Sequence, residues 1–236
     1  MRRPAVLALA CLGLAYASLA QGIGWNQLAH YSLVRALADG SPVVDTYRDE
    51  TGDVAWVNGH YYAAKAPGLA FAALPVFVAL DVTGLKERLA RAPGASDETV
   101  GMLWALGLVG CVLPAFAIAV LVRRLGDRLE SGYGALAAVT AGAGTLLLPF
   151  ATVFFSHVLA AALAFGAFAT LWLRGRLRWW GLLAGVFAGL SVVADYPLAL
   201  AALIVGGYAL SRSRRAGVEY AAGALVGVLP LLAYQW

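Results

Sequence analysis

The sequence predicts an all-α, polytopic membrane protein, and its composition and apolar runs carry this prediction. Of 236 residues, 61% are hydrophobic and only 13% are charged, whereas a soluble domain carries roughly 25% charged residues. Several apolar runs reach about 18 residues, the length needed to cross roughly 30 Å of hydrocarbon. The net charge of +4 comes from short basic clusters between those runs. Such clusters are a signal of membrane topology and do not indicate nucleic acid as a partner.

Eight apolar runs are candidates for crossing the membrane. They cover residues 4–20, 66–82, 100–122, 133–154, 156–173, 179–194, 196–210 and 217–235. The four basic clusters, at residues 2–3, 123–128, 174–178 and 211–215, should all be cytoplasmic. They share one side only if the run at 66–82, which we expect Pro75 to interrupt, lies at the outer membrane face. The sequence therefore predicts about seven transmembrane helices in a bacterial-type inner membrane, with a cytoplasmic N-terminus.

These spans form a single transmembrane domain over residues 1–236. Residues 1–20 make the first span, residues 21–98 a large outer loop with interfacial helices, and residues 99–236 six further spans. The first run resembles a signal peptide, but the further apolar runs behind it favour an uncleaved span. The sequence stops inside an apolar run at "LPLLAYQW", and we expect it to be the N-terminal part of a longer protein.

Near the start of the outer loop, "WNQLAHYSLVRALADG" has the pattern of an amphipathic helix that ends at Gly40. Its apolar side consists of Leu33, Ala36 and Leu37. His30 is expected on the polar side, and Trp25 and Tyr31 suit the level of the lipid headgroups.

The next segment, "DTYRDETGDVAWVNGHYYAAKAPG" at residues 45–68, gathers acids, cations and aromatic rings. "ETGD" and "VNGH" are turn sequences, and "VAW" between them is a candidate strand. Acids beside cations and rings, held by turns against a membrane, can activate a hydroxyl and bind an anionic leaving group. The alternative is a solvated loop whose charges keep it out of the lipid. We expect Asp49 and Glu50 to be solvated.

The order of these features resembles the GT-C superfamily of membrane glycosyltransferases, in particular the protein O-mannosyltransferase and aminoarabinose-transferase type. The matching features are "YAAKAPG" at 62–68, the helix "LAFAALPVFVALDVTG" ending at Gly84, and a span ending "VLVRRLGDRL". They cover about residues 20 to 130. Where the family carries an acidic pair, this chain has Asn26 and Gln27, which cannot act as carboxylate bases. Either the base has moved to Asp45 or Asp53, or activity has been lost, and the motif favours relocation.

The resemblance implies transfer of a sugar from a polyprenyl-phosphate donor to an unidentified acceptor on the outer face. Asp53 or Asp45 would be the base, and Lys65 would bind the donor phosphate, with or without a divalent cation held by the acids. Further candidates for substrate binding are His60, Tyr62, His157 and Asp195. Each has a plainer alternative, such as a snorkelling lysine, an interfacial tyrosine or a capped helix end. We expect His157 and Asp195 to line one outward-facing cavity roofed by residues 45–65.

Two other functions remain open. A transporter or flippase would carry ionisable residues through its spans, whereas few ionisable residues lie in the apolar runs here, and His157 and Asp195 lie at or near run ends. An inactive membrane scaffold is the other alternative, which Asn26 and Gln27 keep open.

Overall fold

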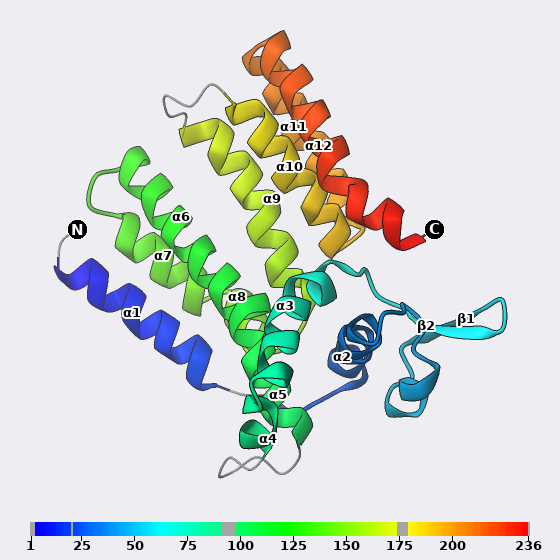
Figure 1. The fold of residues 1–236 in the computed structure, drawn as a ribbon. Helices are drawn as coiled ribbons and strands as arrows, with labels where there is room; N and C mark the ends of the chain where they lie inside the picture. The colour runs from blue at the N-terminus through cyan, green and yellow to red at the C-terminus, as the bar shows by residue number, and fades with distance from the viewer. Residues whose placement is uncertain (1–2, 20, 91–97, 174–178, 236) are drawn as a thin grey trace.

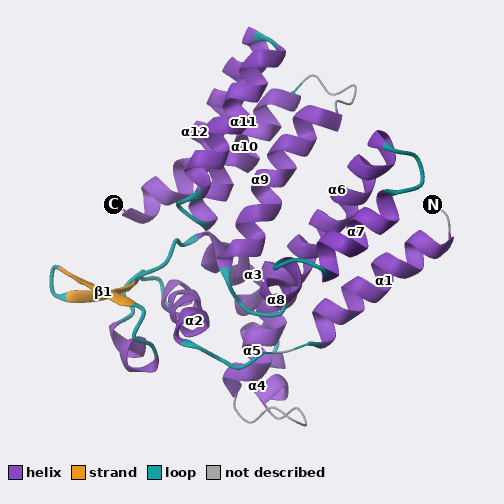
Figure 2. Ribbon diagram, turned by 180° about the vertical axis from the view of Figure 1, so that it is seen from behind, coloured by secondary structure: helices purple, strands orange, loops and turns teal. Residues whose placement is uncertain are grey.

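The computed structural model describes residues 3–19, 21–90, 98–173 and 179–235, and it is helical apart from one β-hairpin (Figures 1 and 2). Within these ranges, three helices are long and apolar enough to cross a bilayer, namely Thr99–Leu129, Ser156–Leu173 and Arg214–Gln235. Five apolar helices are shorter, at 10–17 residues. The fold is thus that of a helical membrane protein, as the sequence predicts.

The helices form two packed groups in the order of the chain. The first contains α1 (Arg3–Ser18), α5 (Glu98–Gly107), the π-helical turn η2 (Leu108–Val112), α6 (Leu113–Leu129), α7 (Gly134–Ala143) and α8 (Leu147–Ala151). The second contains α9 (Ser156–Leu173), α10 (Trp180–Ala194), α11 (Leu198–Arg212) and α12 (Arg214–Gln235). In the second group, Gly185 and Gly189 of α10 face the backbone of α12 so closely that a Cβ would overlap it. Such small residues let membrane helices approach each other.

The residues between α1 and α5 fold into structured elements. They are α2 (Trp25–Ala38), the 3₁₀ helix η1 (Asp45–Glu50), β1 (Val54–Val57), β2 (His60–Ala63), α3 (Gly68–Val82) and α4 (Leu85–Ala90). In Figure 1, α2 and α3 lie across one end of the helical groups, and the hairpin projects beyond them. A shared core of buried residues, which includes Leu33, Leu69 and Met102, joins α2 and α3 to α5. This segment is therefore packed against the helices.

Two apolar runs depart from their expected form. The run at 66–82 is one continuous helix through Pro75, so the proline does not interrupt it. The run at 133–154 is broken in two, because α7 ends where the Gly144 N–H bonds to Thr140 O, and the Thr145 hydroxyl then accepts the N–H of Leu147 at the start of α8.

The start of α1, the α6–α7 turn and the α11–α12 turn lie at the end of the molecule opposite α2 and α3 (Figure 1). The basic residues at 123–128 and 211–215 belong to these two turns or to the helix ends beside them. The predicted cluster at 174–178 lies outside the described residues.

Candidate functional site

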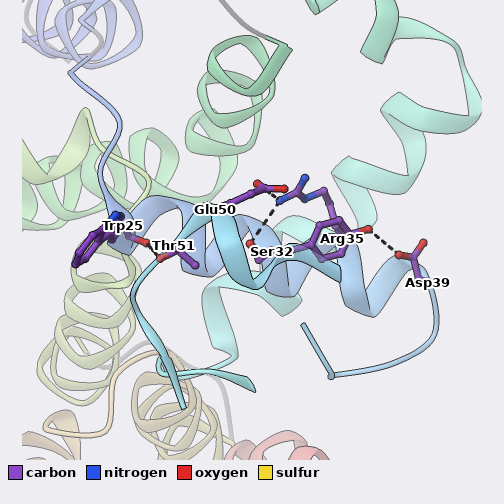
Figure 3. Close-up of polar contacts among 7 residues, drawn as sticks. Trp25, Ser32, Arg35, Asp39, Glu50 and Thr51 are labelled. Carbon is purple, nitrogen blue, oxygen red and sulfur yellow. Dashed lines mark hydrogen bonds and ion pairs between the residues drawn. The ribbon is translucent and has the colours of Figure 1, made fainter. Parts of the chain in front are cut away.

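Arg35 fastens the 3₁₀ helix η1 to helix α2 (Figure 3). Its guanidinium lies 4.4 Å from the ring centre of Tyr31 and 4.0 Å from that of Tyr47, and it pairs with the carboxylate of Glu50. The Tyr47 hydroxyl donates to Asp39 at 2.8 Å. Glu50 is exposed, as expected, and its carboxylate also pairs with this cation held between two rings.

Next along the chain, Thr51 and Gly52 fix the backbone that carries Asp53. The Thr51 hydroxyl donates to the carbonyl of Trp25 at 2.8 Å (Figure 3) and accepts the N–H of Asp53 at 3.1 Å. A Cβ on Gly52 would lie 2.8 Å from atoms of the Trp25 ring, so a larger residue there would push the segment away. The Asp53 carbonyl in turn accepts the N–H of Ala64 at 2.9 Å.

The hairpin brings Asp53 and Lys65 together. Asn58 and Gly59 both have positive φ, 50° and 91°, as a type I′ turn requires. This turn sets Val54 opposite Ala63, so Asp53 and Lys65 become neighbours just beyond the paired strands. The Lys65 Nζ lies 2.9 Å from a carboxylate oxygen of Asp53, with the two side chains 23% and 34% exposed.

Asp45, at the start of η1, and His60, at the start of β2, form a separate pair. His60 Nδ1 lies 2.7 Å from Asp45 Oδ2, and the N–H of Tyr61 donates to Asp45 Oδ1 at 2.6 Å. The His60 hydrogen bond, followed by the Tyr61 N–H, lowers the pKa of Asp45. A carboxylate held this way is a weaker base, so of the two acids proposed as base, the geometry favours Asp53.

His157 and Asp195 contact each other where α9 begins and α10 ends. His157 Nδ1 lies 2.7 Å from Asp195 Oδ2. The rings of Phe150 and Phe155 meet the imidazole edge-on, with centres 5.1 and 5.9 Å away. Asp195 also starts the turn before α11, because its carbonyl accepts the N–H of Leu198 at 3.0 Å.

His30 lies within electrostatic range of Lys65, Asp53 and His157, and it is buried, although the sequence predicts it on the polar side of the helix. It is 1% exposed, because α2 is buried around its whole circumference. Burial first, and then the charges of Lys65 and His157, lower the pKa of His30 to about 3, with Asp53 opposing the shift. Tyr31 is also buried and packs on Phe77, so its ring faces the protein interior.

We call Asp53, Lys65, His157, Asp195 and His30 the polar cluster. The Asp53–Lys65 pair and the His157–Asp195 pair are brought together at Gly68. A Cβ at Gly68 would lie 2.6 Å from the backbone of Ala194. The start of α3, three residues after Lys65, therefore lies directly against the end of α10, one residue before Asp195.

No protein-family model, curated protein or solved structure matches this chain. The resemblance to GT-C glycosyltransferases therefore stands on the sequence motifs, and the chemistry must be argued from the residues themselves.

An apolar cavity of about 880 Å³ opens beside the polar cluster between α3, α9, α10 and α12. Its lining includes Gly68, Phe71, Leu163, Leu190, Ala194 and Tyr234. Tyr62 of β2 and Tyr196 lie within electrostatic range of the Tyr234 phenol, so three hydroxyl-bearing rings gather there. A second cavity of about 450 Å³ is lined by Phe150 and Phe155, the rings that contact His157.

Gln27 has a structural task at the start of α2. Its side-chain oxygen accepts the N–H of Gly24, and its amide nitrogen donates to the carbonyl of Gly22 at 3.3 Å. This is a capping arrangement, and any base must come from another residue. Among the described residues, no group of three or more histidine, cysteine or acidic side chains is placed to hold a metal ion.

Proposed function

We propose that this chain is a membrane glycosyltransferase that moves a sugar from a polyprenyl-phosphate donor to an acceptor at the outer membrane face. The observation that carries the proposal is the position of the Asp53–Lys65 pair. Gly68, three residues after Lys65, lies against the backbone of Ala194, next to Asp195, and both Gly68 and Ala194 line the large apolar cavity. A lipid-linked anionic substrate has an apolar chain and a charged head, which match an apolar cavity with charged side chains nearby.

The cavity and the cluster suit the two halves of such a donor. Its volume of about 880 Å³ lies within the roughly 300–1,000 Å³ of small-molecule sites, and its apolar lining suits an isoprenoid chain. The phosphate would then lie at the cluster, where Lys65 is the cation and can make a charge-assisted hydrogen bond with it.

Exchange of ionic partners gives a mechanism. In the absence of substrate, Lys65 is bound to Asp53. A phosphate that takes up Lys65 leaves the Asp53 carboxylate free to accept the proton of the acceptor hydroxyl. The acceptor oxygen then bonds to the anomeric carbon as the bond from that carbon to the phosphate oxygen breaks. The electron pair leaves with the lipid phosphate, whose charge Lys65 stabilises.

The proposal includes a membrane orientation with about seven spans, a cytoplasmic N-terminus and the polar cluster at the outer face of a bacterial-type inner membrane. It is supported by the positions of the basic helix ends at 123–128 and 211–215, at the end of the molecule opposite α2 and α3. Basic residues favour the cytoplasmic side. The continuous helix α3 would lie at the outer face.

The test is a transfer assay on membranes that contain the chain, with radiolabelled polyprenyl-phosphate hexose and pentose as donors. Lys65→Ala should reduce transfer by about 10²-fold or more, with unchanged membrane insertion. Lys86→Ala is the matched control, because the chain's other lysine pairs with Asp81 at the far end of α3. No labelled product from any donor, or equal loss in both variants, would contradict the proposal. Label that crosses the membrane without forming product would indicate a transporter.

A further inference from the structure

His30 is a buried polar group for which the described residues offer no partner. Neither ring nitrogen has a hydrogen-bond partner among them, and the side chain is 1% exposed. An unpaired buried donor costs free energy that natural folds normally avoid. Its retention between two ion pairs points to a ligand that completes it.

The position of the ring is fixed. Phe154 packs against it with ring centres 6.2 Å apart, and its neighbours Ala29 and Leu33 are fully buried. The ring cannot turn to solvent to find a partner. Lys65 and Asp53, whose charges act on the ring, are partly exposed, so we expect a ligand to approach from their side.

The charges around His30 define the chemistry of that ligand. The groups whose fields reach it are Lys65 between β2 and α3, Asp53 before β1, and His157 on α9. On the other packed elements, Cys111 of η2 donates to the carbonyl of Phe155, and α3 carries only Asp81, at its far end. Lys65 and His157 are nitrogen groups that complement an anion.

We propose that His30 is the buried floor of an oxyanion subsite whose rim is Lys65 and His157, and that a phosphate group bound there accepts a hydrogen bond from its imidazole and draws a proton onto the ring. This inference rests on the proposed function, since it takes the donor phosphate as the ligand. It adds a substrate-binding residue that the sequence motifs do not mark.

The surrounding charges determine the direction in which phosphate binding should change the pKa of His30. Burial, followed by the electrostatic influence of Lys65 and His157, lowers the pKa of His30 to about 3, so the ring is neutral above that pH. A bound phosphate offsets the positive field of Lys65 and His157 and supplies an acceptor. Both changes favour the protonated ring, which takes its proton from solvent.

The experiment is histidine ring ¹⁵N NMR on the full chain in lipid nanodiscs. The chain has three histidines, so His30→Gln, His60→Gln and His157→Gln assign every signal. The probes are farnesyl phosphate, inorganic phosphate and farnesol. At pH 6, saturating farnesyl phosphate should move the His30 nitrogens from neutral towards protonated shifts, and farnesol should not. Inorganic phosphate should give the same response at higher concentration.

Binding measurements complete the test. His30→Gln should weaken farnesyl phosphate binding by about 10-fold or more, as expected for a lost hydrogen bond to a charged group, and should leave farnesol binding unchanged. Unchanged His30 shifts in the saturated wild type, or unchanged affinity in the variant, would overturn the inference. If the variant fails to fold, the wild-type shifts alone decide.

The outcomes also separate this inference from the proposed function. If the chain binds farnesyl phosphate and transfers sugar but the His30 nitrogen shifts do not change, the role of His30 is wrong and the proposed function stands. If farnesyl phosphate does not bind, both fail. If inorganic phosphate binds as tightly as farnesyl phosphate, the subsite serves free phosphate, and the lipid donor is wrong.

Discussion

His157 and Asp195 lie in direct contact, with Nδ1 and Oδ2 2.7 Å apart, although 38 residues separate them in the sequence. Their helices, α9 and α10, run antiparallel, so the first turn of one meets the last residues of the other. The imidazole is about half exposed and the carboxylate 19% exposed. Asp195 directly follows Ala194, which lines the large apolar cavity and approaches Gly68, three residues after Lys65.

The first prediction concerns the coupling of this pair. His157→Gln and Asp195→Asn should each lower the melting temperature and the rate of transfer, because each leaves a partly buried partner unpaired. The double variant should be no worse than the more damaging single variant, a non-additivity that a double-mutant cycle measures.

Arg215→Gln is the control for that cycle. Arg215 pairs with Glu219 one turn along α12 at the other end of the molecule. Such exposed pairs contribute about 0.3–0.5 kcal/mol, so stability and transfer should barely change. Strict additivity at His157 and Asp195 would show that their contact carries no energy.

The second prediction separates the two acids that the sequence left open. Asp53→Asn should reduce transfer by about 10²-fold or more, as for a lost general base. Asp45→Asn should reduce it by less than about 10-fold, because the carboxylate of Asp45 is occupied by His60 and the Tyr61 N–H. Initial rates on membranes with equal protein content decide between them, and the reverse order would place the base on the hairpin.

Much of the fold could be read from the sequence because the apolar runs contain few charged residues and are separated by short polar segments. The run at 156–173 became α9 without change, and "VAW" became part of β1. The turn sequence "VNGH" is also sufficient to predict that Asp53 and Lys65 lie close together. A two-residue Asn-Gly turn fixes the register of a hairpin, and that register places Asp53 opposite Ala64.

The remainder depended on tertiary contacts that a single helix pattern does not contain. The apolar stripe of α2 suggested one buried face, yet His30, Tyr31 and Ser32 are buried along with Leu33. Segments as distant as Phe77 and Phe154 cover its other sides. The contact between His157 and Asp195 likewise requires a particular register between α9 and α10, which no local signal sets.

The third prediction is a pH dependence at the hairpin. The pKa of Asp45 is depressed in the folded chain, chiefly by His60. Its stabilisation should therefore be complete above the unfolded value of about 3.9 and be lost as the pH falls through the folded value. The difference in melting temperature between wild type and Asp45→Asn should stay constant from neutral pH to about pH 5 and shrink below about pH 4. A difference that grew on acidification would contradict the direction of the shift.

The fourth prediction is the membrane orientation. With Cys11 and Cys111 replaced by alanine, a cysteine at Arg124 should react only when a membrane-impermeant reagent has access to the cytoplasm. A cysteine at Asp49, which is 86% exposed beside the hairpin, should react from outside. Labelling of the Arg124 position from outside in intact cells would invert or refute the proposed topology.

The fifth prediction concerns the contact that joins the two halves of the polar cluster. In Gly68→Val, the new Cβ would lie 2.6 Å from the Cα and N of Ala194. Because these atoms are backbone, the start of α3 or the end of α10 must shift, at a cost of about 1–3 kcal/mol. Lys65 would then move relative to Asp195, and transfer should fall with the melting temperature. Gly107→Ala is the control, since nothing lies within 4 Å of a Cβ there. If Gly68→Val melts and transfers like this control, the close approach of α3 to α10 does not set the geometry of the site.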